Sequence, residues 1–172
     1  MKISAELWSF LAAILATLTF ADKTPDLKIN TLTINNTPDN PYFGNWSFEI
    51  SESGDRFSLL FPIKQDYPEN MMFGLAAELN GRQVLSMEMS VCDGLEAGLA
   101  NQRMLDHVYP PDTVQLSCPV KAADYELRDY SFSADNSPFQ LEAGELFVKL
   151  FYFEPDGEPI LTITMEGLIS DK

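Results

Sequence analysis

Few residues of this chain could do chemistry, and its two cysteines are the most informative of them. Cys92 and Cys118 are the only cysteines in the 172 residues. The chain begins with a segment typical of a secretory leader, and secreted domains commonly pair an even number of cysteines. We therefore expect a disulfide between Cys92 and Cys118, which on the chain-entropy argument stabilises the fold by about 3 kcal/mol. Once oxidised, neither thiol is available as a nucleophile.

The remaining candidates do not form a catalytic or metal-binding pattern. His107 is the only histidine, so every site that needs a second one is excluded, and its position near the end of an expected helix suits the helix dipole. Ser90 and Ser117 lack the glycines of a nucleophile elbow. Residues 154–158 are acidic but lack the spacing of a calcium loop, and turn chemistry explains them better. We expect no catalytic residue, no metal site and no cofactor, and predict that the chain is not an enzyme.

The first 21 residues are typical of a cleaved signal peptide. Lys2 precedes an apolar run at residues 7–20, and Ala21 supplies a small residue at the expected cleavage position. The run is too short for a comfortable membrane span. We therefore expect a secreted, extracellular protein without stable membrane insertion, in which residues 22–172 form a single domain. An uncleaved signal anchor is the alternative.

Charge and glycosylation motifs fit an extracellular protein. The chain has 11 Lys and Arg residues against 26 Asp and Glu residues, a formal net charge of −15. Such a charge repels nucleic acid and anionic lipid headgroups, so neither is an expected partner, and the scattered acidic residues are explained by solubility. Asn35 and Asn45 each begin an N-glycosylation sequon.

Alternating apolar and polar residues predict strands through most of the chain. The alternation in residues 27–34 changes phase, which indicates an edge strand or a bulge. The pairs Asn80-Gly81 and Asp156-Gly157 are typical of hairpin turns, the second with a left-handed glycine. The expected strands are residues 27–34, 45–50, 57–63, 71–79, 83–91, 125–132, 146–153 and 160–168. The fold class is therefore all-β, an antiparallel β-sandwich.

Two further patterns complete the expected architecture. Leucines between the cysteines repeat at helical spacing, although Gly94 and Gly98 weaken the pattern, so we expect one short helix there. Residues 146–153 are apolar on nearly both faces, which indicates a strand in the middle of the structure. In the strand at 125–132, simple alternation places Tyr130 and Phe132 on the same side as Arg128.

The second half of the chain resembles a known family. Its pattern is CDGL at residues 92–95, NQRML at 101–105 and SCPVKAADYELRDYSF at 117–132. This resembles the insect-type secreted lipid-recognition-like domain, especially the CheB-type chemosensory proteins and their uncharacterised relatives. It is more distantly similar to the ganglioside activator and the myeloid-differentiation-related lipid-recognition family. Those families usually carry several disulfides, whereas this chain can form one.

The resemblance implies an immunoglobulin-like β-sandwich that holds a lipid or other apolar small molecule between its sheets, with a role in ligand capture such as pheromone or chemosensory perception. The alternative is a packed core and an interaction or co-receptor module, whose partner is an extracellular receptor. Met71, Met72 and Phe73 are further candidates for a cavity wall, because thioethers adapt to irregular ligands. The expected cavity residues are Trp46, Phe48, Phe61, Met87, Met89, Tyr130, Phe132, Leu150, Phe151 and Phe153.

Overall fold

The computed structural model describes residues 26–98, 102–110, 118–131 and 142–170. The expected signal peptide and Phe132 lie outside this range. The described part consists of nine strands and two short helices. Their bounds are β1 Asp26–Asn36, β2 Ser47–Ile50, β3 Phe57–Ile63, β4 Met72–Leu79, β5 Arg82–Ser90, α2 Val91–Glu96, α3 Gln102–Leu105, β6 Val108–Tyr109, β7 Ala123–Tyr130, β8 Gly144–Phe153 and β9 Leu161–Ser170.

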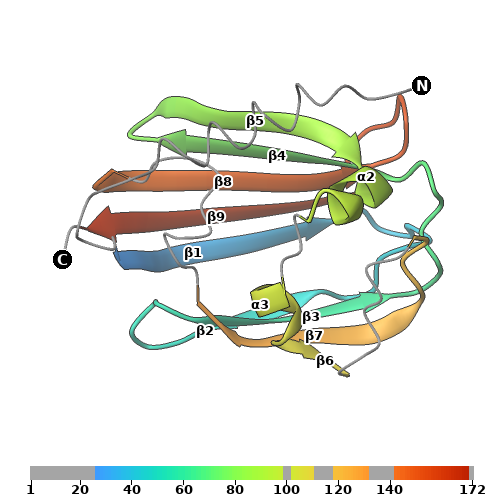
Figure 1. Cartoon of the computed structure of the whole chain (residues 1–172), viewed down its shortest axis with the longest axis horizontal. Coiled ribbons are helices and arrows are strands. Elements are labelled where there is room, and N and C mark those ends of the chain that lie inside the picture. The colour runs from blue at the N-terminus through green and yellow to red at the C-terminus, as the bar shows by residue number, and fades with distance from the viewer. Residues whose placement is uncertain (1–25, 99–101, 111–117, 132–141, 171–172) are drawn as a thin grey trace.

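The strands form two antiparallel sheets that face each other (Figure 1). The large sheet has the order β1-β9-β8-β4-β5, and the small sheet has the order β2-β3-β7-β6. The predicted antiparallel β-sandwich is confirmed, and β8 lies in the middle of the large sheet, as its two apolar faces indicated.

Local turn chemistry explains the hairpins. Asn80 and Gly81 both have positive φ, 53° and 72°, which is what a type I′ turn between β4 and β5 requires. The turn between β8 and β9 differs from the prediction, because Asp156, with φ of 62°, takes the left-handed conformation that was assigned to Gly157. An Asp tolerates that region through its short polar side chain, so the hairpin forms either way.

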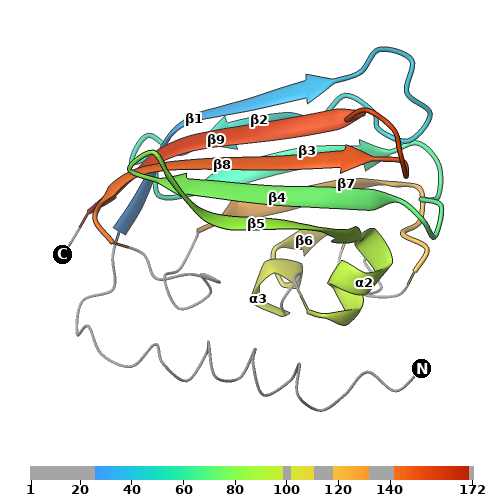
Figure 2. The same ribbon diagram turned by 90° about the horizontal axis from the view of Figure 1, so that it is seen from above.

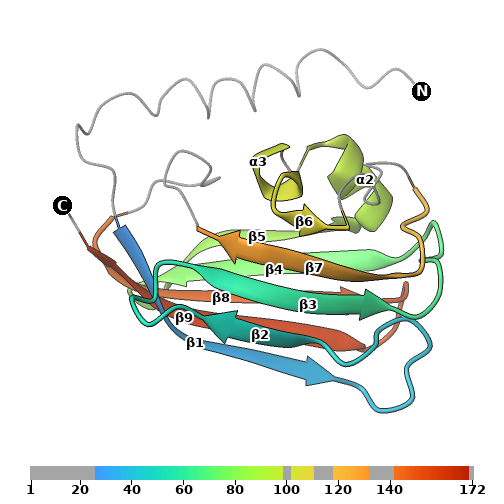
Figure 3. The same ribbon diagram turned by 90° about the horizontal axis from the view of Figure 1, so that it is seen from below.

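The helical segment between the cysteines consists of two pieces. The Ser90 hydroxyl caps the first by accepting a hydrogen bond from the Asp93 amide at 3.0 Å. Leu95 of α2 and Met104 of α3 pack against the buried core. Figures 2 and 3 show both helices along the side of the sandwich where β5 and β6 form the sheet edges. The predicted disulfide between Cys92 and Cys118 is confirmed.

The opposite side of the sandwich is closed by β1 and the β2–β3 turn. The predicted irregularity in β1 is present, because its register with β9 shifts between Ile29 and Thr31, and β1 is an edge strand. The Ile29 amide donates a hydrogen bond to the Gly54 carbonyl of that turn at 2.7 Å. An edge strand has backbone groups that its neighbour does not use, and here one of them links the two sheets.

Gly54 is required at this closure for two reasons. Its φ is +76°, and a Cβ atom there would lie 2.8 Å from Cγ of Lys28 and 2.9 Å from the Ile29 carbonyl oxygen. We expect Gly54→Ala to lower the free energy of unfolding by about 2 kcal/mol or more, since the left-handed conformation alone costs about 1–2 kcal/mol for a residue with a Cβ. Denaturant unfolding measures the loss.

Gly81→Ala is the matched control for this prediction. Gly81 has a similar φ of +72°, but a Cβ there would meet nothing within 4 Å. The free energy of unfolding of Gly81→Ala should therefore fall only by the cost of the left-handed backbone conformation, without a steric contribution. Equal losses in the two variants would contradict the role assigned to the contact with β1.

Candidate functional site

The inner face of the large sheet is defined by strand register. One cross-strand row takes one inward residue from each of its five strands, through the pairs Met87–Leu75, Leu75–Leu150, Leu150–Ile163 and Ile163–Ile34. We call these five residues the central row. Alternation places their side chains toward the small sheet, on the same face as the buried residues Ala77, Leu79 and Met165.

The central row is apolar but incompletely buried. All five side chains keep partial solvent accessibility, although they lie between two sheets. Four of them, Met87, Leu75, Leu150 and Ile163, are not among the hydrophobic residues that pack against the buried cluster. In a filled sandwich the middle row would be the most buried, because interiors are close-packed. The accessible surface of this row therefore indicates a hollow between the sheets.

The two ends of the sandwich are better packed than its middle. At one end, the buried residues Leu79 and Leu146 pair with each other, near Ile29 and Ile169. At the other end, Phe43 is fully buried, and its ring contacts those of Trp46, Tyr67 and Tyr152 at centroid distances of 5.6, 5.5 and 5.3 Å. Phe43 therefore anchors an aromatic cluster that packs this end of the sandwich.

Most of the predicted cavity residues lie on inner faces. Met87, Met89 and Leu150 project from the large sheet, and Phe48 projects from the small one, by the registers of their strands. Trp46 and Phe61 belong to the aromatic packing, with centroids 5.5 Å apart. Of these, Trp46 and Phe61 pack against the buried core. Phe48, Met87, Met89 and Leu150 are not among the residues that pack against it and are partly accessible.

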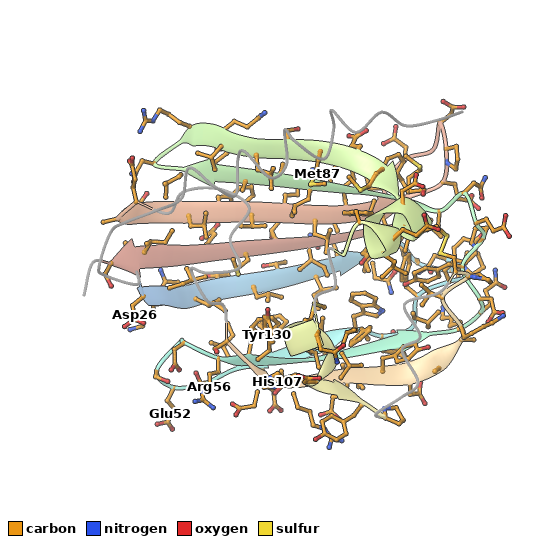
Figure 4. All side chains as sticks on the ribbon, viewed as in Figure 1. Asp26, Glu52, Arg56, Met87, His107 and Tyr130 are labelled. Carbon is orange, nitrogen blue, oxygen red and sulfur yellow. A yellow bond between two sulfur atoms is a disulfide. The ribbon has the colours of Figure 1, made fainter. Side chains whose placement is uncertain are left out.

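Tyr130 reaches the inner face by a route that simple alternation missed. The pairing of β3 with β7 shifts between Phe57 and Leu59, and Asp129 takes a positive φ of 47°. This bulge turns Tyr130 to the same side as Tyr125 and Leu127. The alternation that grouped Tyr130 with Arg128 was therefore wrong, and Tyr130 lies on the inner face expected of a cavity residue. Tyr130 projects from β7 into the space between the sheets, while Met87 lies on the opposite sheet (Figure 4).

Phe151 and Phe153 do not line the hollow. They alternate with Leu150 and Tyr152 on β8 and therefore lie on the outer face, where their rings stack at 5.6 Å. Gly74 lies beneath the Phe151 ring, and Lys149 Nζ lies 5.3 Å from its centroid. The assignment of both phenylalanines to the cavity was wrong, because a strand that is apolar on both faces gives no sign of which face is inward.

The Met71–Phe73 segment also divides between faces. Met71 is fully buried in the core, Met72 lies on the outer face opposite Phe153, and Phe73 lies on the inner face opposite Tyr152. Sequence reasoning missed Leu75, Ile163, Tyr67 and Tyr152. The first two could have been found by extending the alternation of their strands, whereas Tyr67 lies in a loop and carried no such signal.

Burial and hydrogen bonding raise the pKa of four tyrosines. Burial raises the pKa of Tyr152 to about 12 and that of Tyr67 well above 10. Burial also raises the pKa of Tyr125, and the hydrogen bond that Tyr42 donates to Glu154 at 2.7 Å raises the pKa of Tyr42. All four groups are therefore neutral phenols at physiological pH.

These shifts predict alkaline destabilisation. An unfolded tyrosine ionises near pH 10, whereas the folded groups hold their protons to higher pH, so the folded state binds more protons above about pH 10. Their contribution to stability is complete below that pH and is lost as pH rises toward about 12, the pKa of Tyr152. Unfolding free energies measured from about pH 9 to about pH 11 should fall. Tyrosinate absorbance that titrates fully near pH 10 without unfolding would contradict the prediction.

The remaining candidate groups have structural partners. The His107 Nδ1 atom lies 2.8 Å from the Arg128 carbonyl oxygen, and its ring contacts that of Tyr130. Among the described residues, no three His, Cys, Asp or Glu side chains gather in a way that could hold a metal ion. No helix in the described ranges is long and apolar enough to cross a membrane. Asn35 and Asn45 are both exposed.

Comparisons with known proteins add little to this site. No protein-family model matches the chain. No curated protein matches it either. Among solved structures, it is similar to the crystal structure of a Niemann-Pick type C2 protein from Japanese carpenter ant, with 13% identity and a TM-score of 0.29 over 90% of this chain and 98% of that one. The resemblance to the insect-type lipid-recognition-like domain stays a prediction.

Proposed function

We propose that this chain is a secreted binding protein that holds a lipid or other apolar small molecule between its two sheets, and that it is not an enzyme. The observation that carries the proposal is the central row, whose apolar side chains are accessible although they lie between the sheets. Apolar pockets with a few polar groups are the usual form of small-molecule sites. A role in pheromone or chemosensory perception belongs to this proposal.

The charge of the chain supports a neutral ligand. With a formal net charge of −15, the protein repels phosphorylated and other anionic molecules at long range. Burial of each ligand methylene contributes about 0.8 kcal/mol, so a chain of modest length can bind at about micromolar strength after the costs of association.

Extraction and mass spectrometry of protein purified from a secreting host test the proposal. A bound lipid should be recovered, and the stripped protein should take up an environment-sensitive naphthylamine probe that neutral lipids displace. Protein that purifies without lipid and takes up no probe would overturn the proposal.

A second candidate function is an extracellular interaction module with a receptor partner. The outer face of β8 favours it, because Phe147, Phe151 and Phe153 are all partly exposed there. Partly exposed aromatic residues in a row are typical of contact surfaces. This function would replace the first if the stripped protein bound no apolar probe.

Glycosylation provides a separate test of secretion. Both sequon asparagines are exposed, Asn35 at the end of β1 and Asn45 just before β2. We expect both to carry glycans in a eukaryotic secreting host. Glycosidase treatment should increase the gel mobility of the wild type, and the increase should shrink in Asn35→Gln and Asn45→Gln. Unmodified protein in the medium would contradict this prediction.

A further inference from the structure

Two tyrosines lie together beside the middle of the central row, toward one end of the sandwich. Tyr152 follows Leu150 by two residues on β8 and therefore shares its inner face. Tyr67 comes from the loop after β3, and its ring centroid lies 6.3 Å from that of Tyr152. The Phe73 ring, on the neighbouring strand β4, lies 6.5 Å from Tyr152. We call Tyr67 and Tyr152 the tyrosine pair.

The hydroxyls of the tyrosine pair have no hydrogen-bond partner among the described residues. Tyr125 differs, since its hydroxyl donates to the Lys121 carbonyl at 3.0 Å. Within the described chain, every fully enclosed side-chain nitrogen or oxygen has a partner. The two free hydroxyls must therefore retain accessible surface, although Tyr67 as a whole is only 6% exposed.

The positions of both residues place this accessible surface between the sheets. Tyr152 is partly buried on the inner face of β8, and the Tyr67 ring lies 6.3 Å from it. Burial is the main cause of the raised pKa of both tyrosines, to about 12 for Tyr152. A phenol at the outer surface would be stabilised as a phenolate by bulk water, so its pKa would stay near its ordinary value. The two hydroxyls therefore lie on the inner side of the sandwich and keep accessible surface. The nearest part of the inferred hollow is the side chain of Leu150, two residues from Tyr152 on β8.

We propose that Tyr67 and Tyr152 form a polar subsite that hydrogen-bonds the single polar group of a neutral, long-chain ligand such as a fatty alcohol or ester. This inference rests on the proposed function. A neutral phenol can both donate and accept, so it suits a hydroxyl or an ester carbonyl. The rest of the hollow offers aliphatic side chains, which suit the hydrocarbon chain.

A fatty-acid carboxylate fits this subsite poorly. Among the described side chains, the Lys and Arg residues are exposed except Lys149, which lies on the outer face of β8 beside Phe151. No described cation therefore faces the hollow to offset a buried negative charge. Burying an unpaired carboxylate is far more costly than burying an ester.

The test is a ligand series on the full mature protein, with hexadecane, cetyl alcohol, methyl palmitate and palmitate competing against the naphthylamine probe. The variants are Tyr67→Phe, Tyr152→Phe and the double variant. Tyr125→Phe is the matched control, because its hydroxyl is already occupied by Lys121. We expect the double variant to bind cetyl alcohol about tenfold more weakly than the wild type, since two net hydrogen bonds are lost. Hexadecane affinity should stay within about twofold, because a hydrocarbon makes no hydrogen bond.

The outcomes distinguish failure of the subsite from failure of lipid binding. An unchanged ratio of alcohol to hexadecane affinity in the double tyrosine variant would overturn the subsite and leave lipid binding in place. The subsite would also be overturned if the wild type bound palmitate as tightly as methyl palmitate. Wild-type protein that binds none of the four ligands would overturn the proposed function itself. Melting temperature without ligand is the second readout, because removing unpartnered hydroxyls should not lower it. A clear fall would show that they have structural partners.

Discussion

Met87→Asp is expected to abolish uptake of an apolar probe while leaving the protein folded. Met87 belongs to the central row and keeps accessible surface, so an Asp carboxylate there can stay hydrated in the free protein. A bound ligand would remove that water and force the carboxylate to protonate. Protonating an Asp of ordinary pKa at neutral pH costs about 4 kcal/mol, so we expect affinity to fall at least about 100-fold.

Ser86→Asp is the matched control for Met87→Asp. Ser86 is the preceding residue of β5, is exposed and points to the opposite face. Both variants add one negative charge to the same strand, but only Met87→Asp places it in the hollow. Probe titration at neutral pH should show near wild-type affinity for Ser86→Asp, and lowering the pH toward the carboxyl pKa should restore binding by Met87→Asp. Equal losses in both variants would contradict the position of the hollow.

Met87→Trp separates a hollow from a packed core without adding a charge. Overpacking a filled core typically costs about 1–3 kcal/mol of stability. A larger side chain that enters an existing hollow should instead leave the unfolding free energy unchanged or raise it, while it competes with the ligand for space. Reduced probe capacity at undiminished stability supports the hollow, and a destabilised protein with unchanged capacity contradicts it.

The strands and hairpins could be predicted from the sequence because their determinants are local. Asn80-Gly81 sets a turn by backbone preference alone, and the change of phase in residues 27–34 indicates an edge strand or a bulge without reference to the pairing partner. Prediction of the disulfide required only that the chain has two cysteines and a segment typical of a secretory leader. Each of these features depends on residues that are neighbours in the chain or that have one possible partner.

The candidate site could be predicted only in part because it depends on pairing between distant strands. The central row takes one residue from each of five strands, so it exists only once all four registers are set. Phe151 was misplaced because β8 is apolar on both faces, and only the pairing of β8 with β4 and β9 shows which face is inward. The bulge at Asp129 likewise depends on how β7 pairs with β3. The sequence of β7 alone does not specify that pairing.

From the position of the disulfide in the fold, we expect its loss to lower both the stability of the protein and its affinity for polar lipids. Cys92 lies in the first turn of α2, just after β5 of the large sheet, and Cys118 lies in the segment that leads into β7 of the small sheet. The bond therefore links segments that adjoin the two sheets. Backbone hydrogen bonds support the same corner, from Val91 to Met71 at 2.8 Å and from Tyr67 to Val120 at 2.9 Å. The bond therefore constrains the end of the sandwich where Tyr67 lies, as well as the denatured chain.

Cys92→Ala combined with Cys118→Ala should lower the free energy of unfolding by about 3 kcal/mol, as expected for closing a loop of this length. Replacing both residues avoids a free thiol, and wild-type protein reduced with dithiothreitol is the control that keeps both side chains. Denaturant unfolding should show similar losses for the two. In the variant that lacks both cysteines, cetyl alcohol affinity should fall more than hexadecane affinity, because the disulfide no longer constrains the corner where Tyr67 lies. A loss of less than about 1 kcal/mol with unchanged affinities would show that hydrogen bonding and packing hold this corner without the disulfide.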